Sequence, residues 1–480
     1  MSADPHPGAP LKLFNSLTRR IETFAPIRPG EARVYSCGPT VYNYPHIGNM
    51  RAYVFADVLG RTLSWKGYDL THVINITDVG HLTDDADAGE DKLEKAAKER
   101  AQSIWDIARH YTEAYWADVK ALNIREPARW TVATDYVPKM IEFAKSIEAH
   151  CYELPGGLYF DTSTVADYGR LARAATDAGE SRIDPVEGKR QPADFAIWRK
   201  TPPGETRQME WESPWGRGAP GWHLECSVMS EETLGFPFDI HTGGIDHREI
   251  HHPNEIAQNQ AFCGSDGTGA NIWMHNNFLV ERSGKMSKST GEFLRLQLLI
   301  DKGYHPLAYR LMCLQAHYRS ELEFSWEGLQ AALVRLKRMV MATEKLKAAA
   351  TSSSRAQEDV HSVVVEQFDD AISDDLNTPR ALAHAEAVAA ATQFPATNFS
   401  DLLRMDDVLG LNLASLSRTD LRIRPKSATI AEPEIEAALA RRRAARAEKD
   451  FATSDAIRDE LTAKAVEVMD GDPLGWEWKL

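Results

Sequence analysis

Residues 32–77 read ARVYSCGPTVYNYPHIGNMRAYVFADVLGRTLSWKGYDLTHVINIT, and the patterns in this stretch indicate the fold. The apolar run Ala32–Ser36 predicts a strand, the periodic segment Met50–Trp65 predicts a helix, and the β-branched run Thr71–Thr77 predicts a second strand. Strands joined by such a crossover helix pair in parallel. We therefore predict an α/β fold with a doubly wound parallel sheet, in which ligands bind at the carboxyl ends of the strands.

Length and composition bound the class of protein. The 480 residues suggest about three domains. With 55 basic and 70 acidic side chains the net charge is −15, so contact with nucleic acid requires a local basic surface. Five widely spaced cysteines do not resemble a secreted disulfide framework, and no stretch approaches the roughly 20 apolar residues of a membrane span. We expect a cytoplasmic chain with no membrane contact.

The remaining sequence divides by pattern. The stretch from Ala88 to Ser146 is mostly helical in pattern, whereas Cys151–Trp215 consists of short runs broken by glycine and proline, which predicts an insertion. From Pro306 onward the pattern is almost entirely helical, with polar seams at 348–357 and 415–434. The predicted architecture is therefore an α/β domain with an insertion, followed by an all-α C-terminal half.

The tetrapeptide His46-Ile47-Gly48-Asn49 lies where the first predicted strand leads into the first predicted helix. Backbone amides at the positive end of a helix suit a nucleotide phosphate. Taken alone, the motif fits an ordinary βα loop equally well.

A second motif, Lys285-Met286-Ser287-Lys288-Ser289, follows far downstream after a Ser-Gly turn. Two lysines in a loop can bring mobile positive charges to a triphosphate, although a lone Lys/Ser loop is usually a solvated turn. The two motifs together favour nucleotide binding.

Possible metal ligands are concentrated in one window, because six of the 16 histidines lie between residues 223 and 275. A zinc site needs about four N, S or O donors in a tetrahedral arrangement. Spacing alone also allows Cys37 and Cys226 to be buried thiols and Glu255 to cap a helix.

The two nucleotide motifs resemble the H-I-G-H and K-M-S-K-S motifs of class I aminoacyl-tRNA synthetases, with Asn49 in place of the second histidine. Three further segments resemble the cysteinyl-tRNA synthetases, whose patterns are C-G-x-T-V-Y, G-W-H-x-E-C-S and H-H-x-N-E-I-A-Q. The matching segments are Cys37–Tyr42, Gly221–Ser227 and His251–Gln258. The acidic segment Asp84–Asp91 departs from the family pattern, and we assign it no role.

The resemblance implies a Rossmann-like catalytic domain that activates L-cysteine with ATP and Mg²⁺ and transfers it to tRNA(Cys). One zinc ion per chain would select the substrate thiolate. The roles carried over are zinc ligation by Cys37, Cys226, His251 and Glu255; a cysteine pocket at Thr77 and Trp222; ATP binding by Gly48, Gly244 and Asp246; and charge stabilisation by His46, Asn49, Lys285 and Lys288. Because Pro253 disfavours helical geometry at the residue before it, His252 or His247 remains an alternative to His251.

The resemblance also implies a division of the chain into two halves of the catalytic domain (1–118 and 216–300), a connective insertion (119–215), a stem-contact region with helical bundle (301–415) and an anticodon-recognition domain (425–480). In the last, Arg442 and Arg446 lie on one helix face and Trp476 and Trp478 near the end, where they would contact tRNA. A solvated helix face is the alternative for the arginines, and packing on their own domain is the alternative for the tryptophans. We expect a monomer.

Two other functions stay open from the sequence. One is a related ligase that joins cysteine to an amino sugar, a family that lacks the anticodon-recognition region. The other is a catalytically silent paralogue that binds tRNA, for which Asn49 is the only indication.

Overall fold

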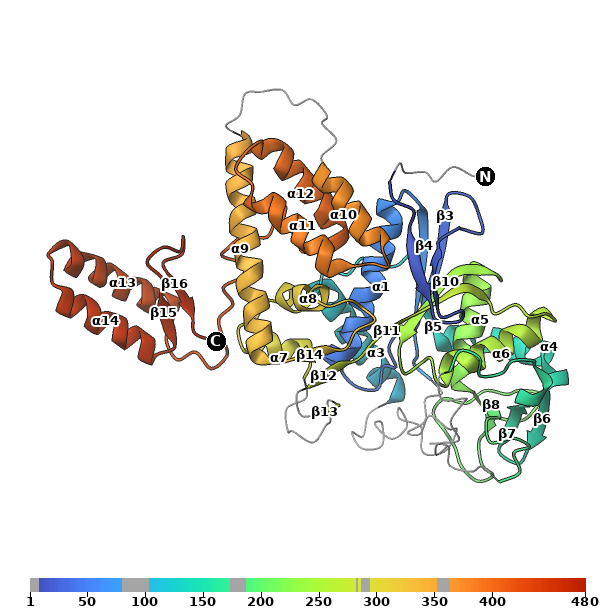
Figure 1. Cartoon of the computed structure of the whole chain (residues 1–480). Helices are drawn as coiled ribbons and strands as arrows, with labels where there is room; N and C mark the ends of the chain where they lie inside the picture. The colour runs from blue at the N-terminus through green and yellow to red at the C-terminus, as the bar shows by residue number, and fades with distance from the viewer. Residues whose placement is uncertain (1–7, 80–102, 173–186, 282–283, 286–293, 352–362) are drawn as a thin grey trace.

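A five-stranded parallel sheet forms the centre of the N-terminal part of the chain (Figure 1). The computed structural model describes residues 8–79, 103–172, 187–281, 284–285, 294–351 and 363–480. The strand order is β11 (Ala270–Asn276), β10 (Phe238–Gly244), β3 (Glu31–Ser36), β4 (Asp69–Ile76) and β5 (Arg129–Val132). All four pairings are parallel, which confirms the predicted doubly wound sheet.

The order of the strands locates a binding crevice. From β3 the chain proceeds through β4 to β5 on one side, and later returns to place β10 and β11 on the other side. Ligands in such sheets bind at this reversal, outside the carboxyl ends of the strands. The reversal lies between β3 and β10, and β3 ends immediately before Cys37.

Helix α1 (Ile47–Trp65) joins β3 to β4 and begins three residues earlier than predicted. The earlier start follows from a reciprocal cap, since His46 Nδ1 accepts from the Gly48 amide at 3.1 Å and Asn49 Oδ1 accepts from the His46 amide at 3.1 Å. One face of the sheet buries side chains against α1, namely Phe55, Leu59, Leu63, Val34, Ile240 and Met274. The other face packs against α3 (Ile104–Ala121), α5 (Trp222–Leu234) and α6 (His251–Cys263).

A second sheet, antiparallel, lies between β5 and α5 in the sequence. Its strands, in order of pairing, are β6 (Cys151–Leu154), β7 (Gly157–Phe160), β8 (Phe195–Lys200) and β9 (Gly218–Pro220). Helix α4 (Val137–Ser146) and three 3-10 turns, η1 (Ala133–Tyr136), η2 (Glu148–His150) and η3 (Thr162–Thr164), accompany it. A short hairpin, β1 (Lys12–Asn15) with β2 (Arg20–Thr23), precedes the main sheet.

The C-terminal half is helical, as predicted. Its elements are α7 (Leu296–Asp301), α8 (Pro306–Leu314), α9 (Trp326–Thr351), α10 (Val363–Ser373), α11 (Thr378–Ala390) and α12 (Pro395–Leu409), followed by α13 (Glu432–Ala447) and α14 (Phe451–Ala463). A three-stranded sheet of β13 (Gly284–Lys285), β12 (Leu279–Glu281) and β14 (Leu322–Phe324) joins this half to the main sheet domain.

The last unit of the chain has its own core. Two short strands, β15 (Val466–Val468) and β16 (Trp476–Trp478), pair against α13 and α14, and this unit lies beyond α9 on the side away from the main sheet (Figure 1). Within the described residues, no helix combines the length and apolar character that a membrane crossing requires.

Candidate functional site

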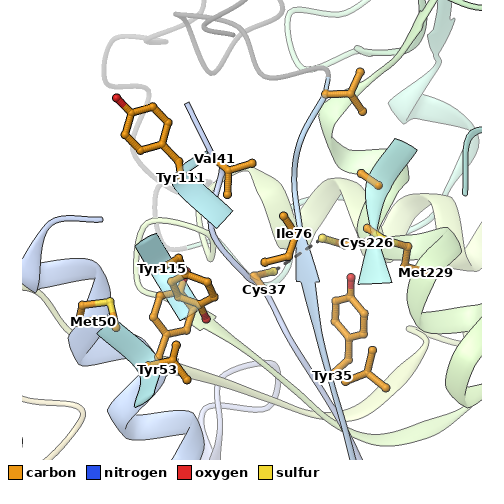
Figure 2. Close-up of a cluster of buried hydrophobic side chains, with 14 of the residues drawn as sticks. Tyr35, Cys37, Val41, Met50, Tyr53, Ile76, Tyr111, Tyr115, Cys226 and Met229 are labelled. Atoms are coloured by element: carbon orange, nitrogen blue, oxygen red, sulfur yellow. Dashed lines mark hydrogen bonds between the residues drawn. The ribbon is translucent and has the colours of Figure 1, made fainter. Parts of the chain in front are cut away.

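Four potential metal ligands converge at the reversal of the main sheet. Cys37 follows β3, Cys226 lies on α5, and His251 and Glu255 lie on α6; one ligand atom from each falls within 4.8 Å of the other three. All four side chains are buried. The two thiol sulfurs point toward each other and are 4.0 Å apart (Figure 2). The sequence therefore predicted a set of residues that the fold brings together.

Helix α6 explains how His251 and Glu255 meet despite Pro253. The helix begins at His251, so the proline occupies its first turn, where the missing N–H would have had no partner within the helix. His251 and Glu255 are one turn apart, and His251 Nε2 lies 3.0 Å from Glu255 Oε1. His251 is therefore compatible with a ligand role.

A second set of donors overlaps the first. Cys37, His241, His252 and Glu255 also bring one ligand atom each within 4.8 Å. His252 Nε2 is 3.3 Å from Cys37 Sγ, and His241 Nε2 is 2.9 Å from Glu255 Oε2. His247 belongs to neither set of described residues. The geometry thus retains His252 as an alternative to His251.

The protonation of the cluster is shaped by its neighbours. The Cys37 thiol lowers the pKa of Cys226 to about 6. Although burial acts in the opposite sense, Glu255 and Cys226 raise the pKa of His251 to about 10, and His241 and His251 lower the pKa of Glu255 to about 2. These shifts leave two anionic groups and one protonated imidazole in the interior, and a divalent cation bound there would take the place of the imidazole proton.

The donor chemistry fits zinc. Two sulfurs, one imidazole and one carboxylate form a four-donor set of the kind that Zn²⁺ binds tetrahedrally. Glu255 Oε1 is buried and accepts no hydrogen bond from the described residues, although His251 Nε2 is nearby. A buried carboxylate oxygen in this state costs free energy unless something else satisfies it, and a metal ion would do so.

The wall beside the cluster contains Thr77 and Trp222. The Trp222 ring lies over His251, with centroids 4.5 Å apart. Thr77 Oγ1 donates to Glu225 Oε2 at 2.9 Å and accepts from Asn75 Nδ2 at 3.0 Å. Burial raises the pKa of Glu225 well above its usual value.

Several residues of this site were missed in the sequence. Glu225 is part of the matched G-W-H-x-E-C-S segment, so its position in that motif could have identified it. His241 on β10 and His275 on β11 lie outside the motifs; His275 Nε2 is 2.8 Å from His252 Nδ1. The concentration of histidines between 223 and 275 was their only signal.

The first nucleotide motif lies at the N-terminus of α1. Burial lowers the pKa of His46 to about 4, so the ring is neutral at pH 7. Since Nδ1 accepts from the Gly48 amide, the proton lies on Nε2, which is then a hydrogen-bond donor. Asn49 is exposed and uses its carbonyl oxygen in the cap, which leaves its NH₂ group as the donor for a ligand.

The other predicted nucleotide residues lie on neighbouring elements. Gly244 is the last residue of β10 and Asp246 follows two residues later, at the same end of the sheet as Cys37. Lys285 ends β13 and pairs with Val280 of β12. Lys288 and the acidic segment 84–91 lie outside the described residues.

The C-terminal residues differ from the prediction. Trp476 and Trp478 are 0% and 2% exposed, because the β15–β16 hairpin folds their rings into the core of its unit. Arg442 is also buried, and its two terminal nitrogens donate to Asp470 at 2.7 and 2.9 Å. Only Arg446 is substantially exposed, with a 2.9 Å contact to the same carboxylate. Both tryptophans thus pack on their own domain, which is the alternative to a stacking role that the sequence left open.

Comparison with known proteins extends over nearly the whole chain. The family described as "tRNA synthetases class I (C) catalytic domain" matches residues 23–334. A cysteine–tRNA ligase from Novosphingobium aromaticivorans is 73% identical, covering 99% of this chain and 98% of the relative. The corresponding ligase from Zymomonas mobilis is 54% identical, with 98% of each chain covered.

Solved structures agree on the fold. Mycobacterium tuberculosis methionyl-tRNA synthetase in complex with methionyl-adenylate aligns with a TM-score of 0.53 and 14% identity, covering 83% of this chain and 92% of that one. At this identity the similarity concerns the fold alone.

Proposed function

The chain belongs to the cysteine–tRNA ligases, a family of class I tRNA synthetases, and on this premise we propose how its residues carry out the reaction. In the first step, the carboxylate of cysteine attacks the α-phosphorus of ATP, forming cysteinyl-adenylate and releasing pyrophosphate. In the second step, a hydroxyl of the terminal ribose of tRNA attacks the adenylate and AMP leaves. The observation that carries the proposal is the convergence of Cys37, Cys226, His251 and Glu255 at the reversal of the sheet.

Phosphate charge in the first step is stabilised by groups of the two nucleotide motifs. His46 Nε2 and the Asn49 amide nitrogen are neutral donors at the positive end of α1, while Lys285 and Lys288 supply positive charge. Gly244 and Asp246 would lie near the ribose, and Mg²⁺ would accompany ATP. Catalysis by this set is positioning and electrostatic stabilisation, with no covalent protein intermediate.

Selection of cysteine over serine is the task of the four-donor cluster. Residues Cys37, Cys226, His251 and Glu255 would hold zinc, which binds thiolate strongly and hydroxyl poorly. An apolar pocket alone discriminates weakly between such near-isosteres. Trp222 over His251, with Thr77 held by Glu225 and Asn75, would form the wall against the substrate side chain.

The tRNA would contact a groove between α9 and the last unit of the chain. This groove has a volume of about 1380 Å³. Its lining includes five basic side chains, Lys302, Arg335, Arg338, Lys464 and Lys479, against the acidic Glu327 and Glu386. Arg335 pairs with Glu386 and Lys464 pairs with Glu460, so Arg338 and Lys479 would carry most of the attraction to a polyanion. Arg446 on α13 would be a further basic contact for the tRNA.

The test is transfer of labelled cysteine to total tRNA in the presence of ATP, beside parallel reactions with serine and with a chelator. We expect charging with cysteine alone, and loss of charging on chelation that added Zn²⁺ restores. Charging that survives complete metal removal would contradict the role of the cluster.

The same assay separates the two alternatives. Adenylate formation without charging of tRNA, followed by transfer to an amino sugar, would indicate the related ligase. Binding of tRNA without adenylate formation would indicate a silent paralogue. The full-length similarity to cysteine–tRNA ligases, which includes residues 425–480, favours charging of tRNA.

A further inference from the structure

One buried arginine connects the two parts of the nucleotide site. Arg51 lies on α1, two residues after Asn49, and is 2% exposed. Its guanidinium donates to four backbone carbonyls: one terminal nitrogen to Asn277, at 2.9 Å, and to Phe278, the other to Ser320, at 2.6 Å, and to His317, at 3.3 Å.

These carbonyls belong to the two turns that lead into the three-stranded sheet β13-β12-β14, called the small sheet below. Residues 277–278 precede β12 and residues 317–320 precede β14, and the two strands pair in parallel with Leu279 opposite Leu322. Strand β13 completes the sheet on the other side of β12 and ends at Lys285. A single guanidinium thus attaches both entering turns of the sheet β13-β12-β14 to α1.

The four hydrogen bonds of Arg51 explain why a buried cation occupies this position. All four hydrogen bonds from Arg51 to described residues go to neutral carbonyls, and burial lowers the pKa of its guanidinium. Burying a cation without a carboxylate is unfavourable, so an apolar side chain of similar volume would pack at lower cost. What the guanidinium adds is a planar fork that fixes four acceptors in one relative geometry.

The attachment is at the first nucleotide motif itself. A Cβ added to Gly48 would lie 3.6 Å from Leu279 Cβ, so the motif packs directly on β12. The amide of Ile47 donates to Leu294 O at 2.8 Å, and its carbonyl accepts from the Tyr309 hydroxyl at 2.6 Å. The first turns of α1 are therefore hydrogen-bonded both to the turns that precede β12 and β14 and to Leu294 and Tyr309.

We propose that Arg51 is a positioning residue for adenylate formation, because it holds the sheet that bears Lys285 at a fixed distance from His46 and Asn49. This inference rests on the proposed role of the two motifs in binding the phosphates of ATP. Misplacement of a charge-stabilising group by about 1 Å is sufficient to reduce a rate by about 100-fold.

The test compares two substitutions of Arg51 with one substitution of Arg61 in the same helix. Arg51→Lys keeps the charge but cannot reach four carbonyls in one plane, and Arg51→Met removes the fork. Arg61→Lys is the matched control: Arg61 is also buried on α1, and it donates to Asp57 and to the carbonyls of Asn123 and Asp407, away from the small sheet.

We expect kcat of cysteine-dependent ATP–pyrophosphate exchange to fall about 10-fold in Arg51→Lys and about 100-fold in Arg51→Met. The KM for cysteine, the zinc content and single-turnover transfer from preformed cysteinyl-adenylate to tRNA should stay within twofold of the unmodified chain. Arg61→Lys should lower the melting temperature as much as Arg51→Lys does, with kcat unchanged.

Two results would overturn the inference. One is an Arg51→Lys enzyme that loses no more exchange rate than Arg61→Lys at an equal loss of melting temperature. The other is a transfer step that slows as much as adenylate formation, which would indicate general disruption. Absence of exchange in the unmodified chain would instead count against the proposed function.

Discussion

The four-donor cluster after β3 and the contacts of the α13 arginines with Asp470 both join residues that are distant in the sequence. Within the described part of the chain, folding leaves a polar atom without a hydrogen bond in the cluster, whereas it pairs the arginines with a carboxylate. In the cluster, Glu255 Oε1 is buried and accepts no hydrogen bond from the described residues. In the C-terminal unit, Arg442, Arg446 and Arg458 all contact Asp470, which holds the pKa of that carboxyl well below its usual range. Binding capacity therefore depends on which groups remain unsatisfied after folding, and a count of charged residues does not reveal it.

The largest expected effect is loss of the metal from the cluster. Cys226→Ser replaces a thiolate ligand with a hydroxyl, so we expect loss of most bound zinc and a fall of at least about 100-fold in cysteine-dependent ATP–pyrophosphate exchange. Elemental analysis and the exchange assay measure the two effects. Cys263→Ser, at the exposed end of α6, is the control and should change neither. Unchanged zinc in Cys226→Ser would refute the assignment.

We expect acid to destabilise the main sheet domain at a higher pH than it destabilises the last unit of the chain. The folded chain keeps His46 and His72 neutral down to a pKa of about 4, whereas the unfolded chain binds protons below about 6.5. Their stabilisation is therefore complete above pH 6.5 and is lost as the pH falls toward 4, by about 1.4 kcal/mol per pH unit for each histidine. Burial raises the pKa of Asp78 to about 6 and that of Asp118 to about 7, which acts in the opposite sense. Burial also lowers the pKa of His223, His252 and His275 well below 6.5, so the histidines together dominate. The unit at 425–480 has no histidine, and the lowered pKa of Asp470 retains its stabilisation until the pH falls below 3.8.

Hydrogen exchange at pH 7 and pH 5, corrected for intrinsic rates, measures this difference. We expect the main sheet to lose protection at pH 5 while β15 and β16 retain theirs. Equal loss of protection in both regions would contradict the account of the histidines.

A buried ion cluster of Glu477, Lys337 and Arg418 joins the last unit of the chain to α9. Glu477 on β16 accepts from Lys337 of α9 at 2.6 Å and also from Arg418. Glu477→Gln removes the carboxylate that contacts Lys337, whereas Arg418 keeps its contact with Asp472 at 3.0 Å. We expect about 3 kcal/mol less stability for this unit, or roughly 100-fold faster local exchange at 466–480, because the buried Lys337 loses its partner. Glu467→Gln, the exposed cross-strand neighbour, should have no such effect. Equal exchange in the two variants would mean that the cluster does not hold this unit in place.

The smallest expected effect concerns charge on α13. Asp470→Asn releases Arg446 and Arg458 from their shared carboxylate, so we expect a KM for tRNA that is a few-fold lower at low salt, with a log–log salt slope about one unit steeper. Adenylate formation should not change. Glu467→Gln makes the same change of charge away from these arginines, and an identical response in that variant would show that α13 does not contact tRNA.

Local patterns predicted the parallel sheet, and the family resemblance implied the four donors whose ligand atoms lie within 4.8 Å of one another. The sequence did not predict the start of α1 at Ile47, since that start depends on a side-chain cap by His46 and Asn49. It also could not distinguish His251 from His252, because Cys37 and Glu255 approach both rings only after the sheet has formed.

The C-terminal unit shows the same limit more strongly. The letters of residues 441–446 indicate a basic helix face, but Asp470 lies 24 residues after Arg446 and reaches it only through the turn between β15 and β16. Likewise, Trp476 and Trp478 read as terminal aromatic residues, and only the pairing of two three-residue strands places them in a core. Contacts of this kind have no signature in local sequence.

Zinc K-edge X-ray absorption of the full chain, with and without L-cysteine, tests the central claim most directly. We expect two sulfur and two lighter ligands from Cys37, Cys226, His251 and Glu255, and a third sulfur when cysteine binds. Serine should add none. A single sulfur before addition would indicate the set that contains His241 and His252, and a ligand sphere unchanged by cysteine would contradict selection of the substrate by its thiolate.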